Sequence, residues 1–272
     1  MEDMLEILTK EQEELLWKTM EMWFNNAYVK KEFNRSLIED SISWLYSISS
    51  LKKPEILYTS SPLQCQSIAS KIKITEHQNR IIYYDPTKNI RYSIEKQFNE
   101  NTPLSDLVYK AIRARVWDQL SLVHEGKCLI EKYLNRSFND QLIKFSRDGI
   151  AAFQWCSYHE FFEKIGVIKS NSSFDKYRNF IFNSGIFLSI YYEDYAIVCP
   201  NASKAFFNKE IQLHSVDGAA ILWEDGFEIY CLFGSVVNKE IVEDYAKKLS
   251  RYKDIKDSVK LYDKDGVLYV ER

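Results

Sequence analysis

The sequence predicts an α+β protein in which a helical N-terminal two-thirds packs with a C-terminal third rich in β-meanders. Apolar residues recur at a helical spacing of three to four up to Gly185, and at a strand-like spacing near two after it. The later runs are also rich in β-branched and aromatic residues, which strands favour. We therefore expect a mainly helical region over 1–185 and a β-rich region with one helix over 186–272, together forming one compact unit.

Capping signals place the first helices. Thr9 and Gln12 have the spacing of a capping box, which predicts a helix that begins at Thr9. A second helical pattern begins near Ser36 and ends before a short strand-like run. Ser61 followed by Pro62 then predicts a third helix, because proline at the first helical position loses no hydrogen bond.

The middle of the chain is less regular before the helical spacing returns. Segment 74–103 is polar, and we expect a surface excursion there. The helical pattern resumes at Leu104. A further helix is expected to be capped by Asp148 and to stop near Gly166, and the last one before the β-rich region should end at Gly185.

Asp-Gly pairs organise the predicted β-rich region. Asp225-Gly226 suits the tight turn of a hairpin, and a second hairpin is expected to turn at Asp265-Gly266. A helix is expected over about 239–251. Along 227–233 both faces are largely apolar, so we expect this strand to be buried between the helical layer and a second surface.

Composition narrows the classes of partner. Lys and Arg number 36 against 39 Asp and Glu, so the net charge is −3. This balance disfavours RNA as a partner, because nucleic-acid binders need a basic face. No apolar run approaches the ~20 residues of a membrane span, and the N-terminus lacks the pattern of a secretory signal. The five cysteines form no CxxC pair. These features predict a soluble, cytoplasmic protein with no membrane partner.

The first candidate site combines one histidine with two aspartates. His214, Asp217 and Asp225 could bring an imidazole and two carboxylates together for general acid–base chemistry or for a metal. The alternative is structural: both aspartates precede glycine, as is typical of turns in which the Asp side chain caps its own backbone.

The second group of candidates lies on the predicted helices. His159 follows Trp155 by four residues, which places both on one helix face. They could line a pocket, or His159 could be a core histidine whose polar atoms have hydrogen-bond partners. Arg113 and Arg115 precede Trp117. Together they could bind an anionic or base-like ligand, or they could form a solvent-exposed helix face.

The familiar motifs of nucleotide, zinc and calcium sites are missing from the sequence. It contains no Walker A loop, no GxGxxG, no HExxH, no GxSxG and no EF-hand loop. The sequence therefore indicates no particular cofactor, and we predict no metal site.

Residues 213–237, "LHSVDGAAILWEDGFEIYCLFGSVV", resemble the signature of an uncharacterised, mostly bacterial domain-of-unknown-function family, approximately LHxxDGPAIxWxDGxxxYxxHGxxV. Shorter likenesses extend the resemblance over about 9–237. Ala219 stands where the family usually has Pro, and Phe233 stands where it often has His. The missing second histidine weakens a two-histidine catalytic or metal site. The signature positions that match are His214, Asp217, Gly218, Asp225, Gly226, Tyr230 and Gly234.

We expect a binding or interaction protein that recognises a macromolecular partner, most simply another protein, through aromatic-rich surface. The alternative is an enzyme of the hydrolase or RNA-processing type, with His214, Asp217 and His159 around a cleft between the helical and β parts. A third hypothesis, RNA binding through Arg91, Arg113 and Arg115, is disfavoured by the acidic balance.

Overall fold

The computed structural model describes residues 8–28, 32–75, 87–97, 102–112, 148–209, 212–254, 261–264 and 267–270. The α+β class is confirmed. The chain divides into two compact units, one formed by Met1–Ala205 with Leu222–Phe227 and the other by Phe206–Ile221 with Glu228–Arg272. The strands that directly follow Gly185 belong to the first unit.

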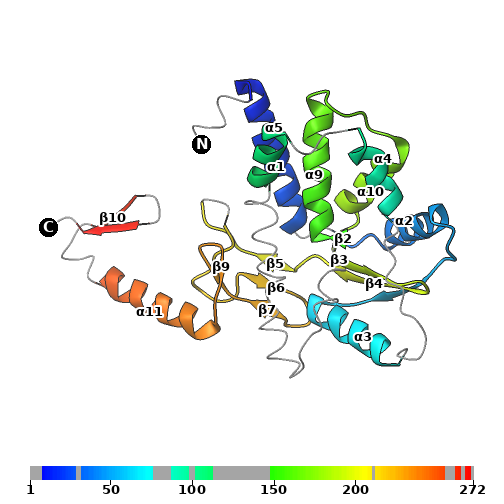
Figure 1. Ribbon diagram of the computed structural model, residues 1–272. Helices are drawn as coiled ribbons and strands as arrows, with labels where there is room; N and C mark the ends of the chain where they lie inside the picture. Colours follow the sequence, from blue (N-terminus) through cyan, green and yellow to red (C-terminus); the bar gives the residue numbers. More distant parts are fainter. Residues whose placement is uncertain are drawn as a thin grey trace. The chain divides into compact units, whose positions relative to one another are not determined.

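The first unit contains most of the described helices (Figure 1). They are α1 (Lys10–Tyr28), α2 (Arg35–Ile48), α3 (Pro62–Thr75), α4 (Lys88–Glu95), α5 (Pro103–Ile112), α9 (Ile150–Lys164) and α10 (Ser172–Asn183). Its strands include β1 (Glu55–Tyr58), β2 (Asp148–Gly149), β3 (Ile186–Tyr191), β4 (Tyr195–Pro200) and β5 (Lys204–Ala205).

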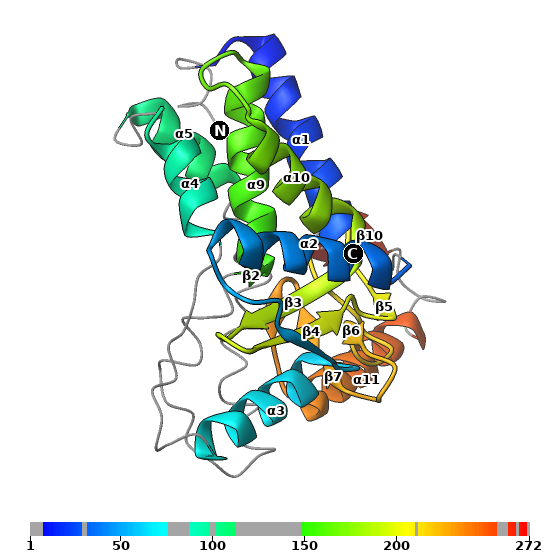
Figure 2. The ribbon, with the colours of Figure 1, turned by 90° about the vertical axis from the view of Figure 1, so that its right-hand side faces the viewer.

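A four-stranded sheet in the order β1-β4-β3-β2 forms the base of this unit. β3 pairs antiparallel with β4 and β2, whereas β1 lies parallel to β4. Every residue of β3 is buried, because helices cover both faces of the sheet. Figure 2 shows α2 on one face and α3 on the other. From α2, the hydroxyl of Tyr46 donates to the carbonyl oxygens of Tyr192 and Tyr195, at 2.5 and 3.1 Å.

The remaining helices of the first unit pack against one another. α9 contacts α1, α5 and α10, and α10 also contacts α4 and α2. Their shared core consists mainly of aromatic side chains, of which Trp23, Phe153, Phe161, Phe162, Phe174, Tyr177 and Phe180 are fully or almost fully buried. The helices that matter for the site are therefore held by a rigid aromatic core.

Two of the predicted helix starts are confirmed by their capping bonds. The backbone N–H of Gln12 donates to Thr9 Oγ1 at 3.2 Å, and that of Thr9 donates to Gln12 Oε1 at 3.1 Å. At α3 the backbone N–H of Gln64 donates to the hydroxyl oxygen of Ser61 at 3.2 Å. These signals are local in sequence, so they can be recognised without tertiary information.

The middle of the chain contains one helix that the sequence analysis did not predict and another that begins later than predicted. Segment 74–103 contains the helix α4, whose only buried residues, Ile90 and Ile94, lie one turn apart in a polar stretch. Asp148 does not begin the following helix, because its backbone pairs with Ser189 of the sheet and α9 begins only at Ile150. In both places a tertiary contact, which the local pattern does not show, decides the structure.

The end of α10 requires a glycine. Gly185 has a φ of 72°, and a Cβ atom at this position would lie 2.7 Å from the backbone oxygen of Glu32. A larger residue would therefore strain the backbone and clash with another segment. The predicted helix end at Gly185 is confirmed.

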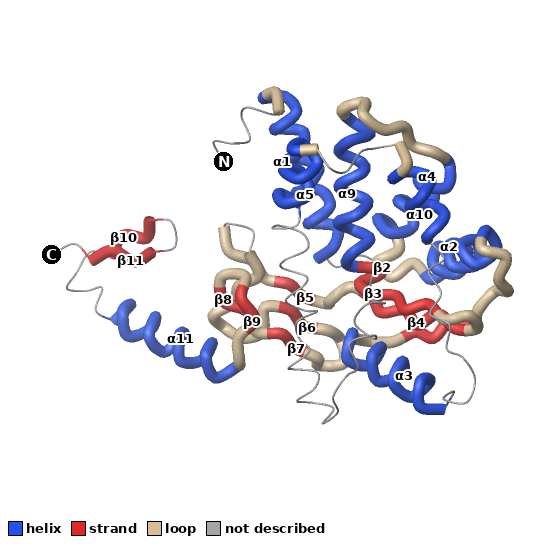
Figure 3. Tube along the Cα trace, in the orientation of Figure 1, coloured by secondary structure: helices blue, strands red, loops and turns tan. Residues whose placement is uncertain are grey.

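The remaining elements are short strands and one helix (Figure 3). β6 (Ile221–Leu222) lies where the chain passes between the units, and the second unit holds β7 (Glu228–Ile229), β8 (Cys231–Leu232), β9 (Ser235–Val236), α11 (Lys239–Asp254), β10 (Leu261–Lys264) and β11 (Val267–Val270). β8 pairs with β9, and β10 with β11, both antiparallel. No described helix has the length and apolar composition that a membrane span requires.

The expectation of one strand with two buried faces over 227–233 is wrong. The segment forms two short strands on either side of Tyr230. Ile229 and Cys231 are buried, but Glu228 is exposed and Phe233 is 41% exposed. Phe233 also has a φ of 50°, so the extended backbone on which the alternation argument depends ends before it.

Candidate binding pocket

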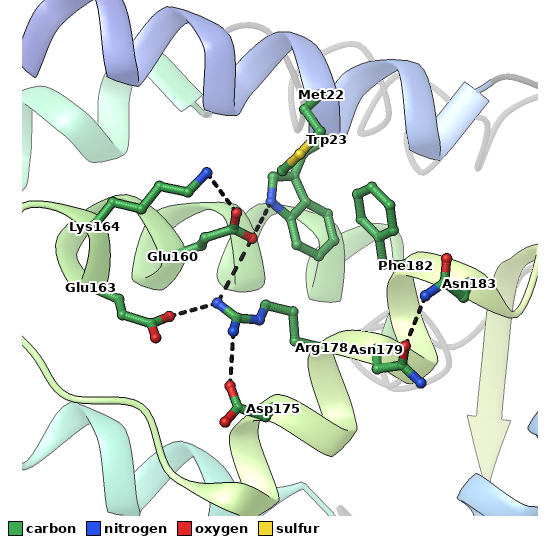
Figure 4. A pocket seen from close by; sticks show the side chains of 10 residues that line it. All are labelled: Met22, Trp23, Glu160, Glu163, Lys164, Asp175, Arg178, Asn179, Phe182 and Asn183. Atoms are coloured by element: carbon green, nitrogen blue, oxygen red, sulfur yellow. Dashed lines mark hydrogen bonds and ion pairs between the residues drawn. The ribbon is translucent and has the colours of Figure 1, made fainter.

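Helices α1, α9 and α10 of the first unit surround a pocket of about 610 Å³ (Figure 4). A volume of this size is typical of sites that hold small ligands or groups of similar size. The lining combines charged, amide and apolar side chains. It consists of Met22, Trp23, Glu160, Glu163, Lys164, Asp175, Arg178, Asn179, Phe182 and Asn183.

Trp23 of α1 fixes the buried end of the pocket. Its indole ring is fully buried and meets the rings of Phe153 and Phe182 edge to face, with centroids 5.8 and 5.0 Å away. The indole Nε1–H donates to Oε2 of Glu160 at 2.9 Å. The apolar body of the side chain therefore joins the core, while its one polar atom holds a carboxylate at the pocket.

Glu160 is the most buried charged side chain of the lining, with 11% of the side chain exposed. Besides the indole bond, its Oε1 lies 2.7 Å from the ammonium nitrogen of Lys164, one helical turn further along α9. Glu followed four residues later by Lys is the favourable orientation of such a pair on a helix. A carboxylate at this depth depends on these partners, because an unpaired buried charge is strongly destabilising.

Arg178 of α10 forms the centre of the facing wall. Its Nη1 donates to Glu163 Oε2 at 2.5 Å, and its Nη2 donates to Asp175 Oδ1 at 2.8 Å. The guanidinium carbon lies 5.2 Å from the ring centre of Phe174, and Nη1 is 3.9 Å from Glu160. Two carboxylates and an aromatic ring thus fix the guanidinium between α9 and α10.

The charges of the lining leave a negative surplus. Three carboxylates (Glu160, Glu163, Asp175) face two cations (Lys164, Arg178), which gives a sum of −1. Each cation already contacts a carboxylate. The charged groups of the described lining therefore form a network of ion pairs in which the carboxylates are in excess.

The predicted pairing of Trp155 and His159 is confirmed, with His159 buried in the core and the two rings in contact, while Trp155 is half-buried. Their centroids are 4.4 Å apart, and His159 also contacts the rings of Tyr158 and Phe174. Its Nδ1 lies 2.9 Å from the carbonyl oxygen of Trp155, while Nε2 has no partner among the described residues. Burial lowers the pKa of His159 to about 4, although the bond to the Trp155 carbonyl opposes that shift.

Trp155 reaches outward from the same cluster. Its Nε1–H donates to Glu95 Oε1 at 3.1 Å, and the guanidinium carbon of Arg91 lies 5.9 Å from the ring centre. The ring therefore links α9 to α4. Of the two interpretations of this helix face, the contacts favour a core histidine.

His214 lies in the second unit and supports the backbone around it. Its Nδ1 accepts a hydrogen bond from the backbone N–H of Phe233 at 3.1 Å, and the two rings lie 4.4 Å apart at 33°. Its own backbone N–H donates to the carbonyl oxygen of Phe206 at 3.0 Å. Where the resembled family often has a second histidine, this chain has an aromatic ring that packs on the first.

Of the two candidate aspartates, Asp225 lies in a turn. Oδ1 of Asp225 accepts from the backbone N–H of Phe227 at 3.1 Å, and Gly226 has a φ of 84°. The backbone N–H of Trp223 closes the hairpin on the carbonyl oxygen of Phe227 at 2.9 Å, which confirms the turn at Asp225-Gly226. Asp217 is exposed in the second unit.

Arg113 and Arg115 lie outside the described residues. Within the described ranges, no group of three or more His, Cys, Asp and Glu side chains is arranged to hold a metal ion.

The pocket was not predicted from the sequence. One local signal existed, because Glu160 and Lys164 have the spacing of a helical ion pair in "HEFFEK". The bond from Trp23 to Glu160 joins residues 137 positions apart, and that from Arg178 to Glu163 joins two helices. No sequence spacing predicts contacts of this kind.

No family model, curated protein or solved structure matches the chain. The resemblance to the domain-of-unknown-function family therefore stays a prediction.

Proposed function

We propose that this chain is a binding protein that recognises a macromolecular partner, most simply another protein, and that the pocket between α1, α9 and α10 receives part of that partner. The observation that carries the proposal is the ordered ion network of the lining. Its charged groups are held in place before any ligand arrives, which lowers the entropy cost of binding.

The enzymatic alternative, with His214, Asp217 and His159, has less support. A general base needs a ring nitrogen that can reach a substrate proton. His159 is 1% exposed and enclosed by aromatic rings, and Nδ1 of His214 accepts a backbone N–H. We therefore assign both histidines structural roles.

RNA is also a poorer candidate for this pocket than a protein. Phosphate groups need unneutralised cations, and both cations of the lining are paired with carboxylates. We place the function in the cytoplasm, because the four described cysteines are buried thiols that form no disulfide.

A blocking substitution tests the proposal. Asn179 is exposed on α10 and lines the pocket, so Asn179→Trp should fill the pocket without changing the core. Asn25→Trp is the matched control, because Asn25 is exposed on α1 and is not part of the lining. Each purified variant is immobilised, and the proteins and nucleic acids that it retains are identified by mass spectrometry.

We expect a specific protein to be retained by the wild type and by Asn25→Trp, and to be lost with Asn179→Trp. Retention of the same partners by all three proteins would show that the pocket is not the recognition site. Retention of nucleic acid in place of protein would contradict the assigned class of partner.

A further inference from the structure

We infer that the pocket between α1, α9 and α10 takes a cationic group on an aliphatic stem, a guanidinium or an ammonium, and that an arginine or lysine side chain of the partner supplies it. This inference rests on the proposed function and names the chemistry that the pocket recognises. It follows from the charges, the acceptor atoms and the apolar wall of the lining.

The cations of the lining are not available to an anionic ligand. Lys164 contacts Glu160 at 2.7 Å, and Arg178 donates to Glu163 and Asp175. An incoming carboxylate or phosphate would have to displace one of these partners and would also meet the negative surplus of the pocket. Like charges brought together at short range oppose binding, so anions are disfavoured.

The carboxylates, in contrast, keep acceptor capacity toward the solvent. Asp175 uses Oδ1 for both Ser170 and Arg178, and Glu163 uses Oε2 for Arg178. Among the described residues, Oδ2 of Asp175 and Oε1 of Glu163 have no partner. A carboxylate has about four lone-pair sites, so each group can accept further hydrogen bonds from a cation.

The exposure of the three carboxylates increases from Glu160 through Glu163 to Asp175. The exposed fraction of the side chain is 11% for Glu160, 29% for Glu163 and 51% for Asp175. A cation that enters would meet the carboxylates of Asp175 and Glu163 before it reaches Glu160, which is already held by the Trp23 indole. The two outer carboxylates should therefore provide the recognition, and Glu160 should support the wall.

The apolar part of the lining suits the stem of such a side chain. Met22 and Phe182 are both partly exposed and line the same pocket as the carboxylates, as Figure 4 shows. Arginine and lysine bury their methylene groups along apolar surface while the charged end seeks polar partners. The pocket offers both surfaces, whereas a simple inorganic cation would use only the carboxylates.

The inference is tested by calorimetric titration at low salt with small probes. Acetyl-Gly-Arg-Gly-amide carries the arginine side chain in a peptide. Agmatine carries the same guanidinium group in a small amine without a peptide backbone. The citrulline form of the peptide keeps the shape but lacks the charge, and the glutamate form reverses it. We expect binding in the order arginine peptide, agmatine, citrulline peptide, with the glutamate peptide weakest.

Two variants connect the binding to the outer carboxylates. Asp175→Asn and Glu163→Gln should each weaken the arginine peptide about tenfold, because each removes a charged acceptor. Glu14→Gln on α1 is the matched control, since Glu14 is 74% exposed and lies outside the lining. It should leave the affinity unchanged. Thermal melts confirm that each variant is folded.

Several outcomes of these titrations would contradict the inference. It is wrong if the glutamate peptide binds as tightly as the arginine peptide, or if both pocket variants keep full affinity. Equal affinity for agmatine and the peptide would overturn the assignment to a partner side chain and leave a free amine as the ligand. If the partner is lost with Asn179→Trp but no cationic probe binds, this inference fails while the proposed function stands.

Discussion

Two consecutive residues of α9 show opposite ways of burying a polar side chain. His159 points into an aromatic cluster with Trp155, Tyr158 and Phe174, and its Nε2 has no partner among the described residues. Glu160 points toward the pocket and is held by an indole N–H and an ammonium group. Neighbouring positions on a helix differ by about 100°, so one helix presents both environments.

The difference shows which side of α9 belongs to the core and which side to a site. The histidine stays neutral because burial lowers its pKa to about 4, and a neutral ring adds packing to the core. The carboxylate is paired and faces a cavity with a negative surplus. We therefore expect changes on the first side to affect stability, and changes at the outer part of the second side to affect binding.

The largest effect should come from the residue that joins the core to the pocket. Trp23→Ala removes a fully buried indole and should lower the free energy of unfolding by about 3–5 kcal/mol. Trp23→Phe keeps most of the packing and should cost less, because it removes mainly the hydrogen bond to Glu160. Urea denaturation measures both. Equal and small losses for the two variants would contradict the supporting role of the indole.

Acid should destabilise the protein through His159. Its pKa is about 4 in the folded protein and about 6.5 in the unfolded chain, so the unfolded chain binds more protons between these values. The free energy of unfolding should therefore decrease on the order of 3 kcal/mol from this group as the pH falls from about 6.5 to 4. The stability that depends on neutral His159 is fully present above about pH 6.5, and it is lost as the pH falls toward the folded-state pKa of about 4.

His159→Leu isolates this effect from the titration of the carboxylates. The variant should lose less stability than the wild type over the same pH range, as measured by denaturant unfolding at several pH values. If the two proteins lose the same stability between pH 6.5 and 4, His159 is not the neutral core histidine that we describe.

A smaller effect is expected from Glu160. Glu160→Ala should lower the free energy of unfolding by about 1–3 kcal/mol, because it leaves the buried indole N–H of Trp23 without its acceptor. Glu163→Ala should cost less, because its side chain is more exposed and, among the described residues, it pairs with Arg178 alone. The reverse order in thermal or urea unfolding would show that the ion network is centred on Arg178 instead.

The smallest effect is expected for an ion pair on α1 that lies outside the pocket lining. Glu14 and Lys18 lie 4.0 Å apart on α1 with about three-quarters of each side chain exposed. Glu14→Gln should change the free energy of unfolding by less than about 0.5 kcal/mol. A loss as large as that of Glu160→Ala would show that the exposure of an ion pair does not predict its contribution to the stability of this protein.

The sequence predicted the features that depend on neighbours along the chain. The capping box at Thr9, the helix start at Pro62 and the hairpin at Asp225-Gly226 follow from local hydrogen bonds or from backbone conformation. The helix α4 was missed because two isoleucines in a polar stretch give little periodic signal, although both are buried.

The pocket could not be predicted in the same way. Its three helices begin at residues 10, 150 and 172, and its key contacts join Trp23 to Glu160 and Arg178 to Glu163. The most visible signal, the histidine-containing signature, instead marks a turn-rich segment in which His214 and Asp225 support the backbone. Turn chemistry and site chemistry use the same residue types, and tertiary contacts distinguish them.

The two sides of α9 can be compared in one spectrum. The Trp23 indole N–H donates to Glu160 at the pocket, and the Trp155 indole N–H donates to Glu95 beside the histidine cluster. Both appear among the six indole signals of a ¹H–¹⁵N correlation spectrum, and Trp23→Phe and Trp155→Phe assign them.

Titration with acetyl-Gly-Arg-Gly-amide is the most direct test of the binding pocket. We predict that the Trp23 signal moves progressively with added peptide while the Trp155 signal stays in place, and that the citrulline peptide moves neither. Movement of the Trp155 signal alone, or no movement of either signal at saturating peptide, would contradict the assignment of the pocket as the binding site.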